Sequence, residues 1–257
     1  MRPFEALKIS LCATTVLALA VTTPASAATV FTDSTFNLAN YQSSTQFLTG
    51  AGTSLVPIQC SSCGNPGTAL QVTATFTTFP PSPAFDVAEQ AYVNTGFSYN
   101  PGTQGPITSL FASVDKNLSV NLPSGPTPYS NTFHPTIEQN GIFYLASIPG
   151  PSLLLNNGVG GQTGYNTISG GLTAADFTEF DFTTGVSDGT HPDFAGAPMV
   201  FGLTQVFSAN SGGPTEIAMG QYDNLRFAIN APEPASLGLL GVGVLGLGLA
   251  RRRRRSQ

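Results

Sequence analysis

Hydrophobic and polar residues alternate in three clear stretches of this chain. Apolar side chains occupy every second position from Leu70 to Phe76, from Leu118 to Leu122 and from Leu225 to Ile229. Successive side chains of a β-strand point to opposite faces of a sheet. The two-residue period therefore predicts strands that have one buried and one solvated face.

Shorter apolar segments predict further strands, because turn-forming residues separate them. Examples of these turn signals are Asn65-Pro66-Gly67 and Asn100-Pro101-Gly102. The further candidates are Val93–Tyr99, Ser109–Asp115, Ile142–Ala146, Ser152–Leu155, Phe177–Phe182 and Met199–Phe207. A single helical turn is expected at Ala174 to Asp176. Many short strands with Gly/Pro turns predict an all-β fold, a single antiparallel β-sandwich over Ala28–Asn230.

The first 27 residues have the pattern of a secretory signal peptide, expected to form a helix. Arg2 and Lys8 precede an apolar run from Ile9 to Val21, and Ala25-Ser26-Ala27 fits the small-residue rule for cleavage. The mature protein is therefore predicted to begin at Ala28, after cleavage by signal peptidase.

The last 27 residues, Ala231 to Gln257, combine a polar element, an apolar run and a cationic end. The run from Leu237 to Ala250 has no charged residue. With Ala235 and Ser236 it makes a helix roughly 24 Å long, which is slightly shorter than the membrane core of about 30 Å. Five stop-transfer residues follow: Arg251, Arg252, Arg253, Arg254 and Arg255. The pattern predicts a transmembrane helix whose arginines stay in the cytoplasm.

The order Pro232-Glu233-Pro234, a short Gly/Leu-rich helix and an arginine cluster resembles the PEP-CTERM sorting signal of Gram-negative bacteria. The resemblance implies recognition by a membrane-embedded exosortase, a transient intermediate in the inner membrane, and cleavage near the PEP triplet. The product would then reach the cell surface or the medium. On this interpretation, Pro232, Glu233 and Pro234 are recognition residues.

Charge excludes one large class of partners. Seven of the nine Lys and Arg residues lie in the two terminal segments, which leaves Lys116 and Arg226 against twelve acidic residues in the body. The body has a formal charge of −10 and almost no cations with which to neutralise phosphates, so nucleic-acid binding is excluded. Neutral sugars, metal ions and cationic partners remain.

The order of the motifs in the body resembles a jelly-roll module of the concanavalin-A-like or laminin-IV-like kind. The pieces that carry this resemblance are Gly64–Gly67, Leu172–Phe177, Pro192–Phe194 with Val200–Leu203, and Tyr222–Phe227. It implies a module that binds a glycan or the extracellular matrix. The chain contains no tryptophan, so the usual aromatic platform for sugar stacking is missing.

Cys60 and Cys63 are the two cysteines that remain after removal of the signal peptide. Outside the cytoplasm an oxidised pair is expected, so Cys-Ser-Ser-Cys predicts a local disulfide. The two histidines, His134 and His191, both precede proline and are expected to be solvated loop residues. No Gly-x-Ser-x-Gly elbow accompanies them, which argues against a serine hydrolase.

Two carboxylates suggest an enzymatic alternative. Glu179 and Asp181 alternate with phenylalanines, so both are expected on one face of a strand, with Cα atoms roughly 7 Å apart. Paired carboxylates hydrolyse glycosides. The same pattern also fits the wet face of a strand in an acidic protein.

Calcium is the one candidate cofactor. It prefers several carboxylates together with carbonyl oxygens. Asp33 near the first strand and Asp223 with Asn224 in the last strand occupy the places where jelly-roll modules often share a structural calcium. Surface carboxylates that only promote solubility give the same pattern.

These observations predict an exported, surface-associated, non-enzymatic protein that binds an extracellular polysaccharide or matrix. The alternatives are a glycoside hydrolase that uses Glu179 and Asp181, and a purely structural coat or adhesion component.

Overall fold

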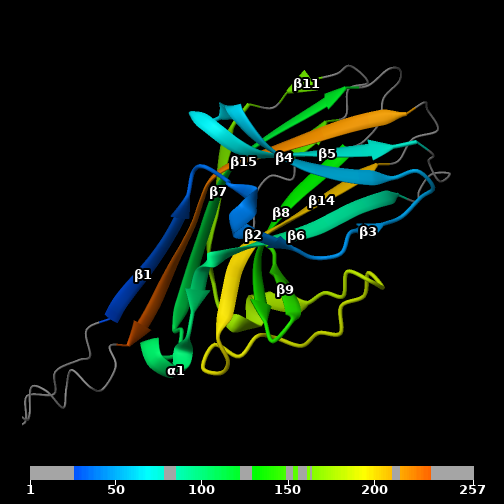
Figure 1. The fold of residues 1–257 in the computed structure, drawn as a ribbon. Helices are drawn as coiled ribbons and strands as arrows, with labels where there is room; N and C mark the ends of the chain where they lie inside the picture. Colours follow the sequence, from blue (N-terminus) through cyan, green and yellow to red (C-terminus); the bar gives the residue numbers. More distant parts are fainter. Residues whose placement is uncertain are drawn as a thin grey trace, which may run out of the picture.

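Two antiparallel β-sheets packed face to face make up the body of the protein (Figure 1). This computed structural model describes residues 26–77, 85–121, 129–148, 153–155, 161–162, 164–209 and 215–232. The predicted all-β sandwich is confirmed. The predicted transmembrane helix lies outside the described residues, and so does the predicted signal helix except for Ser26 and Ala27, which belong to β1. Ala231 and Pro232 of the sorting segment belong to β15. None of the helices in the described ranges is long and apolar enough to cross a membrane.

The seven-stranded sheet has the order β11-β7-β15-β5-β4, with β1 also paired to β15 and β12 to β7. Its strands are β1 (Ser26–Asp33), β4 (Ser54–Gly64), β5 (Gly67–Phe76), β7 (Ser109–Asn121), β11 (Gly161–Gln162), β12 (Asn166–Leu172) and β15 (Glu216–Pro232). The long strand β15 pairs along one edge with β5 and then with β1.

The eight-stranded sheet has the order β13-β9-β8-β14-β6-β2, with β3 also paired to β6 and β10 to β8. Its strands are β2 (Tyr41–Ser43), β3 (Phe47–Leu48), β6 (Asp86–Tyr99), β8 (Tyr129–Gln139), β9 (Ile142–Ala146), β10 (Leu153–Leu155), β13 (Phe177–Glu179) and β14 (Met199–Ala209). The strand β13 and the pair β2/β3 therefore lie at opposite edges of this sheet.

The helical content is small. A four-residue helix, α1 (Pro101–Gln104), follows β6, and the single turns η1 (Leu38–Asn40) and η2 (Ala174–Asp176) are 3₁₀ helices. The turn predicted at Ala174 to Asp176 is thus confirmed. A capping box between Thr173 and Asp176 fixes its start, because each residue satisfies a backbone or side-chain donor of the other.

The alternation of apolar and polar residues correctly predicted which face of β5 is buried. Leu70, Val72, Ala74 and Phe76 of β5 are all fully buried. In contrast, the predicted strand Phe177–Phe182 ends at Glu179. Strands β4, β8 and β12 were not predicted from the sequence, and the single strand β7 was predicted as two strands.

An aromatic cluster joins the two sheets beside the paired strands β1 and β15. The Phe31 ring of β1 stacks on Phe97 of β6 with 5.2 Å between centroids, and Phe201 lies 5.4 Å from Phe227. Such ring pairs add roughly 1 kcal/mol each beyond the burial of their area. Lys116 of β7 is also buried, and its Nζ donates to the backbone oxygen of Asn131. Burial lowers the pKa of this amine to about 7.

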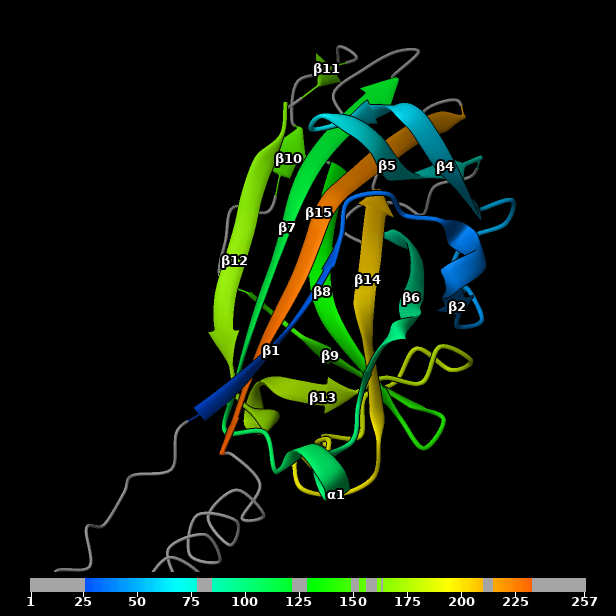
Figure 2. The same cartoon turned by 60° about the vertical axis from the view of Figure 1, so that its left-hand side comes forward.

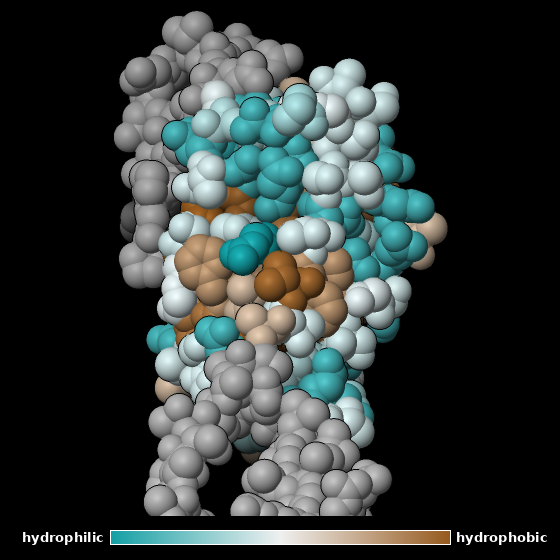
Figure 3. All heavy atoms as spheres, turned by 90° about the vertical axis from the view of Figure 1, so that its left-hand side faces the viewer, coloured by the Kyte–Doolittle hydropathy of each residue, from teal (hydrophilic) through white to brown (hydrophobic). Residues whose placement is uncertain are grey.

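The outer face of the seven-stranded sheet carries a small apolar patch among polar side chains (Figure 3). Val30 of β1 and Phe111 of β7 are both exposed, and both pair with Ala228 of β15. The Arg226 guanidinium lies 5.6 Å from the centre of the Phe111 ring. One of the two basic residues of the body is thus held by a cation–π contact.

Candidate ligand-binding groove

A hairpin of residues 179–190 follows strand β13. The Glu179 amide donates to the Thr190 oxygen at 2.9 Å, and the Asp181 amide donates to the Val186 oxygen at 3.0 Å. The Gly185 amide closes the turn on the Asp181 oxygen at 2.7 Å, and Gly185 has a φ of 70°. Glycine adopts this left-handed conformation without steric cost.

The hairpin reaches the opposite edge of the eight-stranded sheet. The ring of Phe180 lies 6.0 Å from the ring of Phe47, edge to face. A Cβ on Gly185 would lie 2.2 Å from Cζ of Phe47. Because Phe47 belongs to β3 and the hairpin follows β13, residues 179–190 cross the outer face of the sheet from edge to edge.

A groove with a volume of about 330 Å³ runs beside this hairpin. Its floor crosses the sheet, because Glu89, Val206 and Thr132 lie side by side on β6, β14 and β8. The neighbours Leu145 and Thr178 on β9 and β13 continue this floor. The groove is lined by Glu89, Thr132, His134, Leu145, Ser147, Thr178, Glu179, Phe180, Ser187 and Val206. This volume lies in the range of small-ligand sites.

Glu89 is the most unusual residue of the groove. Its side chain is only 6 % exposed, and no hydrogen bond to its carboxyl group occurs among the described residues. Burial raises its pKa from 4.5 to about 7. Buried carboxyl groups normally have a hydrogen-bond partner. Glu89 is therefore a buried group, about half protonated at pH 7, with hydrogen-bonding capacity left for a ligand.

His134 does not lie in a solvated loop, so that prediction was wrong. It is a half-buried residue of strand β8, and burial lowers its pKa. Its Nδ1 lies 3.0 Å from the Ala146 oxygen, and its Nε2 lies 3.1 Å from Oγ1 of Thr132. A neutral ring that donates from Nδ1 and accepts at Nε2 satisfies both contacts. His191 is exposed, as expected, and its Nδ1 contacts the Phe177 oxygen.

Glu179 and Asp181 do not project side by side from one strand. Glu179 ends β13 and accepts a hydrogen bond of 2.6 Å from the Thr190 hydroxyl. Asp181 is exposed and caps the hairpin turn by accepting from the Thr183 amide and the Thr184 hydroxyl. These hydrogen bonds lower the pKa of Asp181. Asp181 lines a second hollow, of about 350 Å³, on the other flank of the hairpin.

The carboxyl groups proposed for calcium have separate hydrogen-bond partners. Asp33 accepts from two backbone amides and from the side chains of Thr35, Tyr41 and Asn94, which lowers its pKa against the effect of burial. Asp223 accepts from the amides of Asn65 and Asn224. The residues that the structure describes contain no cluster of three His, Cys, Asp or Glu suited to a metal ion. The calcium site stays a prediction.

Across the sheet from Asp223 lies Asp115 of β7. Burial raises the pKa of Asp223, and the neighbouring charges of Asp115 and Asp33 add to this effect. The side-chain amide of Asn224, the residue after Asp223, donates from Nδ2 to the Asp115 carboxyl group at 2.9 Å. Sequence reasoning had named Asp223 and Asn224 and missed Asp115.

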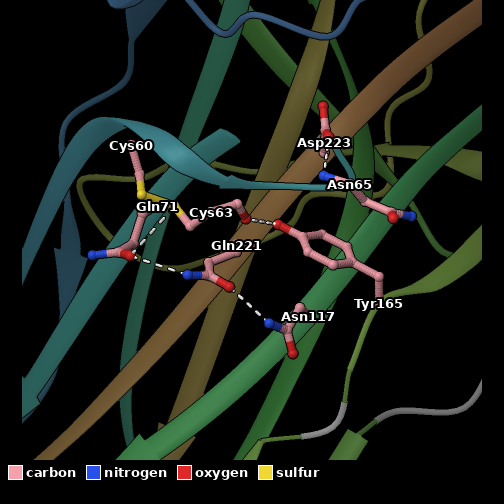
Figure 4. Close-up of a disulfide and its surroundings, with 8 residues drawn as sticks. All are labelled: Cys60, Cys63, Asn65, Gln71, Asn117, Tyr165, Gln221 and Asp223. Carbon is pink, nitrogen blue, oxygen red and sulfur yellow. Dashed lines mark hydrogen bonds between the residues drawn. A yellow bond between two sulfur atoms is a disulfide. The ribbon is translucent and has the colours of Figure 1, made fainter. Parts of the chain in front are cut away.

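Cys60 and Cys63 form a disulfide in strand β4, beside the loop that leads into β5 (Figure 4). The hydroxyl group of Tyr165 donates a hydrogen bond to the backbone oxygen of Cys63. Below the disulfide, Asn117 donates to Gln221 at 2.7 Å, and Gln221 donates to Gln71 at 3.1 Å. A row of amide groups thus links β7, β15 and β5.

The C-terminal end of the chain matches a known family of sequence motifs. Residues 230–255 match the PEP-CTERM protein-sorting motif. The C-terminal segment is a PEP-CTERM motif. The sorting signal inferred from Pro232, Glu233, Pro234 and the arginine cluster is therefore confirmed. A search of curated proteins gives no match for this chain.

The body of this PEP-CTERM chain resembles solved carbohydrate-binding modules. A family 27 module that recognises mannan has a TM-score of 0.35 and 11 % identity, over 79 % of this chain and 98 % of the module. A family 22 module of Clostridium thermocellum Xyn10B has a TM-score of 0.30 and 12 % identity, over 79 % and 93 %. A xylan-binding module of Paenibacillus barcinonensis Xyn10C has a TM-score of 0.28 and 10 % identity, over 80 % and 97 %.

Proposed function

We propose that this chain is exported, sorted to the cell surface through its PEP-CTERM motif, and binds a neutral glycan in the groove beside residues 179–190. Signal peptidase and exosortase are the proposed processing partners, with a transient inner-membrane intermediate. The confirmed motif supports the sorting step. The groove supports the binding step.

The single observation that carries the binding proposal is the buried carboxyl group of Glu89, which lines the groove without a hydrogen-bond partner among the described residues. A bound hydroxyl group would supply this partner, and such a hydrogen bond contributes about 1 kcal/mol. Sugars present hydroxyl groups that both donate and accept. A protonated carboxyl group complements such hydroxyls.

The rest of the groove fits the same chemistry. Thr132, Ser147 and Ser187 place hydroxyl groups along it, while Leu145, Val206 and Phe180 provide apolar surface for the faces of sugar rings. Glu179 is the second carboxylic residue that lines the groove. Two carboxyl groups and an acidic body repel anionic polysaccharides. We infer a neutral glycan as the ligand.

A glycan array that compares the processed protein with Glu89→Ala tests this proposal. The wild type is expected to bind neutral glycans, and Glu89→Ala is expected to bind them about 10 to 100 times more weakly. Asp181→Asn is the matched control, because this carboxylate lies on the other flank of the hairpin. Equal binding by all three proteins, or none by a folded wild type, would rule the groove out and favour a structural coat component.

Glycoside hydrolysis is the second candidate function, and one observation favours it. Glu89, with its pKa of about 7, and Glu179 line the same groove, and glycosidases use a pair of carboxyl groups. Reducing-end release from array hits distinguishes the two functions. A binding module leaves its ligand intact, whereas hydrolysis that Glu89→Gln abolishes would identify an enzyme.

A further inference from the structure

The two ends of the folded body lie side by side as paired strands. In β1 and β15, Ala28 is opposite Asn230, Ala27 is opposite Ala231, and Ser26 is opposite Pro232. Figure 2 shows the start of β1 and the end of β15 together at one end of the sandwich. The PEP-CTERM motif begins at residue 230, so its first three residues form part of the sheet.

The start of the motif is also held from its other side. The Asn230 oxygen accepts from the amide and the hydroxyl of Thr108, both at 2.9 Å. The Asn230 Nδ2 donates to the Ser109 hydroxyl at 2.9 Å. Ala231 is 2 % exposed and belongs to the hydrophobic core, as does Ile229. The folded body therefore includes β15 as far as Ala231.

A peptide bond in a paired strand is a poor substrate for proteolysis, because the chain must first open locally. Opening at Asn230 would break its contacts with Thr108 and Ser109, whereas beyond it Ala231 and Pro232 have the partners Ala27 and Ser26. These partners lie before the predicted cleavage point at Ala28. Removal of the signal peptide would therefore take away the two residues of β1 that pair with Ala231 and with Pro232, the start of the PEP triplet.

We propose that the N-terminal segment controls access to the sorting motif, so that cleavage before Ala28 must precede removal of the C-terminal tail. The inference rests on the proposed export and sorting. Signal peptidase hydrolyses the Ala27–Ala28 bond with one water, which leaves a carboxylate on the released leader and an amine on Ala28. Ala231 and Pro232 then lose their pairing with Ala27 and Ser26. Exosortase hydrolyses a bond C-terminal to Ala231 with a second water, and β15 stays whole as far as Ala231.

Two matched double variants in a host that contains the exosortase test this order. Ser26→Leu/Ala27→Leu and Ser26→Pro/Ala27→Pro both remove the small residue that the leader cut requires. The leucines keep the strand, whereas two successive prolines remove whichever amide faces β15. Intact mass of the isolated proteins reports both ends. The leucine variant is expected to retain leader and tail, and the proline variant is expected to retain the leader but lose the tail.

Equal tail removal from both variants, or equal retention, would overturn the inference. A wild-type protein that keeps its tail would instead overturn the proposed sorting itself. Hydrogen exchange supplies a second measurement if the proline variant does not fold. The peptide around Ala231 is expected to exchange at least tenfold more slowly in the leucine variant than in a chain that starts at Ala28. Equal exchange in these two chains would also contradict the inference.

Discussion

Phe47 and Glu89 lie directly opposite each other on strands β3 and β6. Residues paired in this way have side chains on the same face of the sheet, with Cβ atoms roughly 5 Å apart. The ring of Phe47 also contacts Phe180 and faces Gly185 of the hairpin. One aromatic residue therefore lies beside Glu89 on the same face of the sheet and contacts the hairpin of residues 179–190.

Phe47→Ala is expected to open the groove. Loss of the ring lets water reach Glu89, so the pKa of this carboxyl group should fall from about 7 towards its ordinary value of 4.5. Because Phe47 is only half-buried, the free energy of unfolding should fall by about 1–2 kcal/mol. NMR titration of the Glu89 side chain measures the pKa directly. An unchanged pKa in a folded variant would show that another group causes the burial.

Gly185→Ala is expected to displace the hairpin. The new Cβ would lie 2.2 Å from the Phe47 ring, and the residue has a φ of 70°. We expect a loss of about 2–3 kcal/mol in the free energy of unfolding together with weaker glycan binding.

Gly189→Ala is the matched control for this substitution. Gly189 has a φ of 80°, but a Cβ there would meet no atom within 4 Å. It should show only the backbone cost, about 1 kcal/mol, with binding retained. Equal effects of the two substitutions on binding would argue against the contact between Gly185 and Phe47.

Glu89 should make stability depend on pH. Its pKa is raised on folding, so the native state binds more protons than the unfolded state between about pH 4.5 and 7. The contribution of Glu89 is therefore most favourable below pH 4.5, declines as the pH rises through 7, and is least favourable above it. The whole change amounts to about 3 kcal/mol.

The difference between the wild type and Glu89→Gln isolates this effect, because other titrating groups, among them His134 and Lys116, are common to both proteins. Denaturant unfolding at several pH values should show the wild type losing stability relative to the variant from pH 5 to 8. Parallel profiles would mean that Glu89 does not have a raised pKa.

Calcium is expected to stabilise the body by binding at the carboxyl group of Asp223. The carboxyl groups of Asp115 and Asp223 face one another across β7 and β15, and a cation would relieve their repulsion. Calcium should raise the melting temperature of the wild type by a few degrees and have no such effect on Asp223→Asn. Calorimetry without heat of binding and without a shift in melting temperature would remove calcium from the account.

Asp33→Ala is expected to destabilise the body whether calcium is present or absent. The carboxyl group of Asp33 accepts hydrogen bonds from Thr35, Phe36, Tyr41 and Asn94, and these donors would all lose their acceptor. The expected loss is about 2–3 kcal/mol in the free energy of unfolding. A loss seen only with calcium would instead place the ion at Asp33.

Local patterns in the sequence predicted what depends on local chemistry. Strict alternation identified the buried faces of β5 and the end of β15, and Cys60 and Cys63 are close enough in sequence to suggest their bond. Strand β8 was missed, because Pro135 and the two residues around it suggested a turn. In the sheet, Pro135 pairs with Leu203 of β14 while His134 faces the groove.

The groove itself could not be predicted, because it depends on contacts between distant segments. Glu89 is brought close to Thr132 only because both of their strands pair with β14, and the hairpin lies beside them through the contact of Phe47 with Phe180. One signal was present in the sequence. A single glutamate stands among the apolar residues of Val87 to Val93, and a charged group inside such a strand often has a function.

The central claim is that a neutral glycan binds against the outer face of the eight-stranded sheet. The two histidines of the chain make the most direct test, because His134 lines the groove and His191 lies outside it. Imidazole NMR signals are followed while soluble neutral oligosaccharides are added to the processed protein. The account predicts that the His134 signals shift in a saturable way while those of His191 stay unchanged. Saturable binding that leaves His134 unchanged, or no binding by any neutral oligosaccharide, would contradict it.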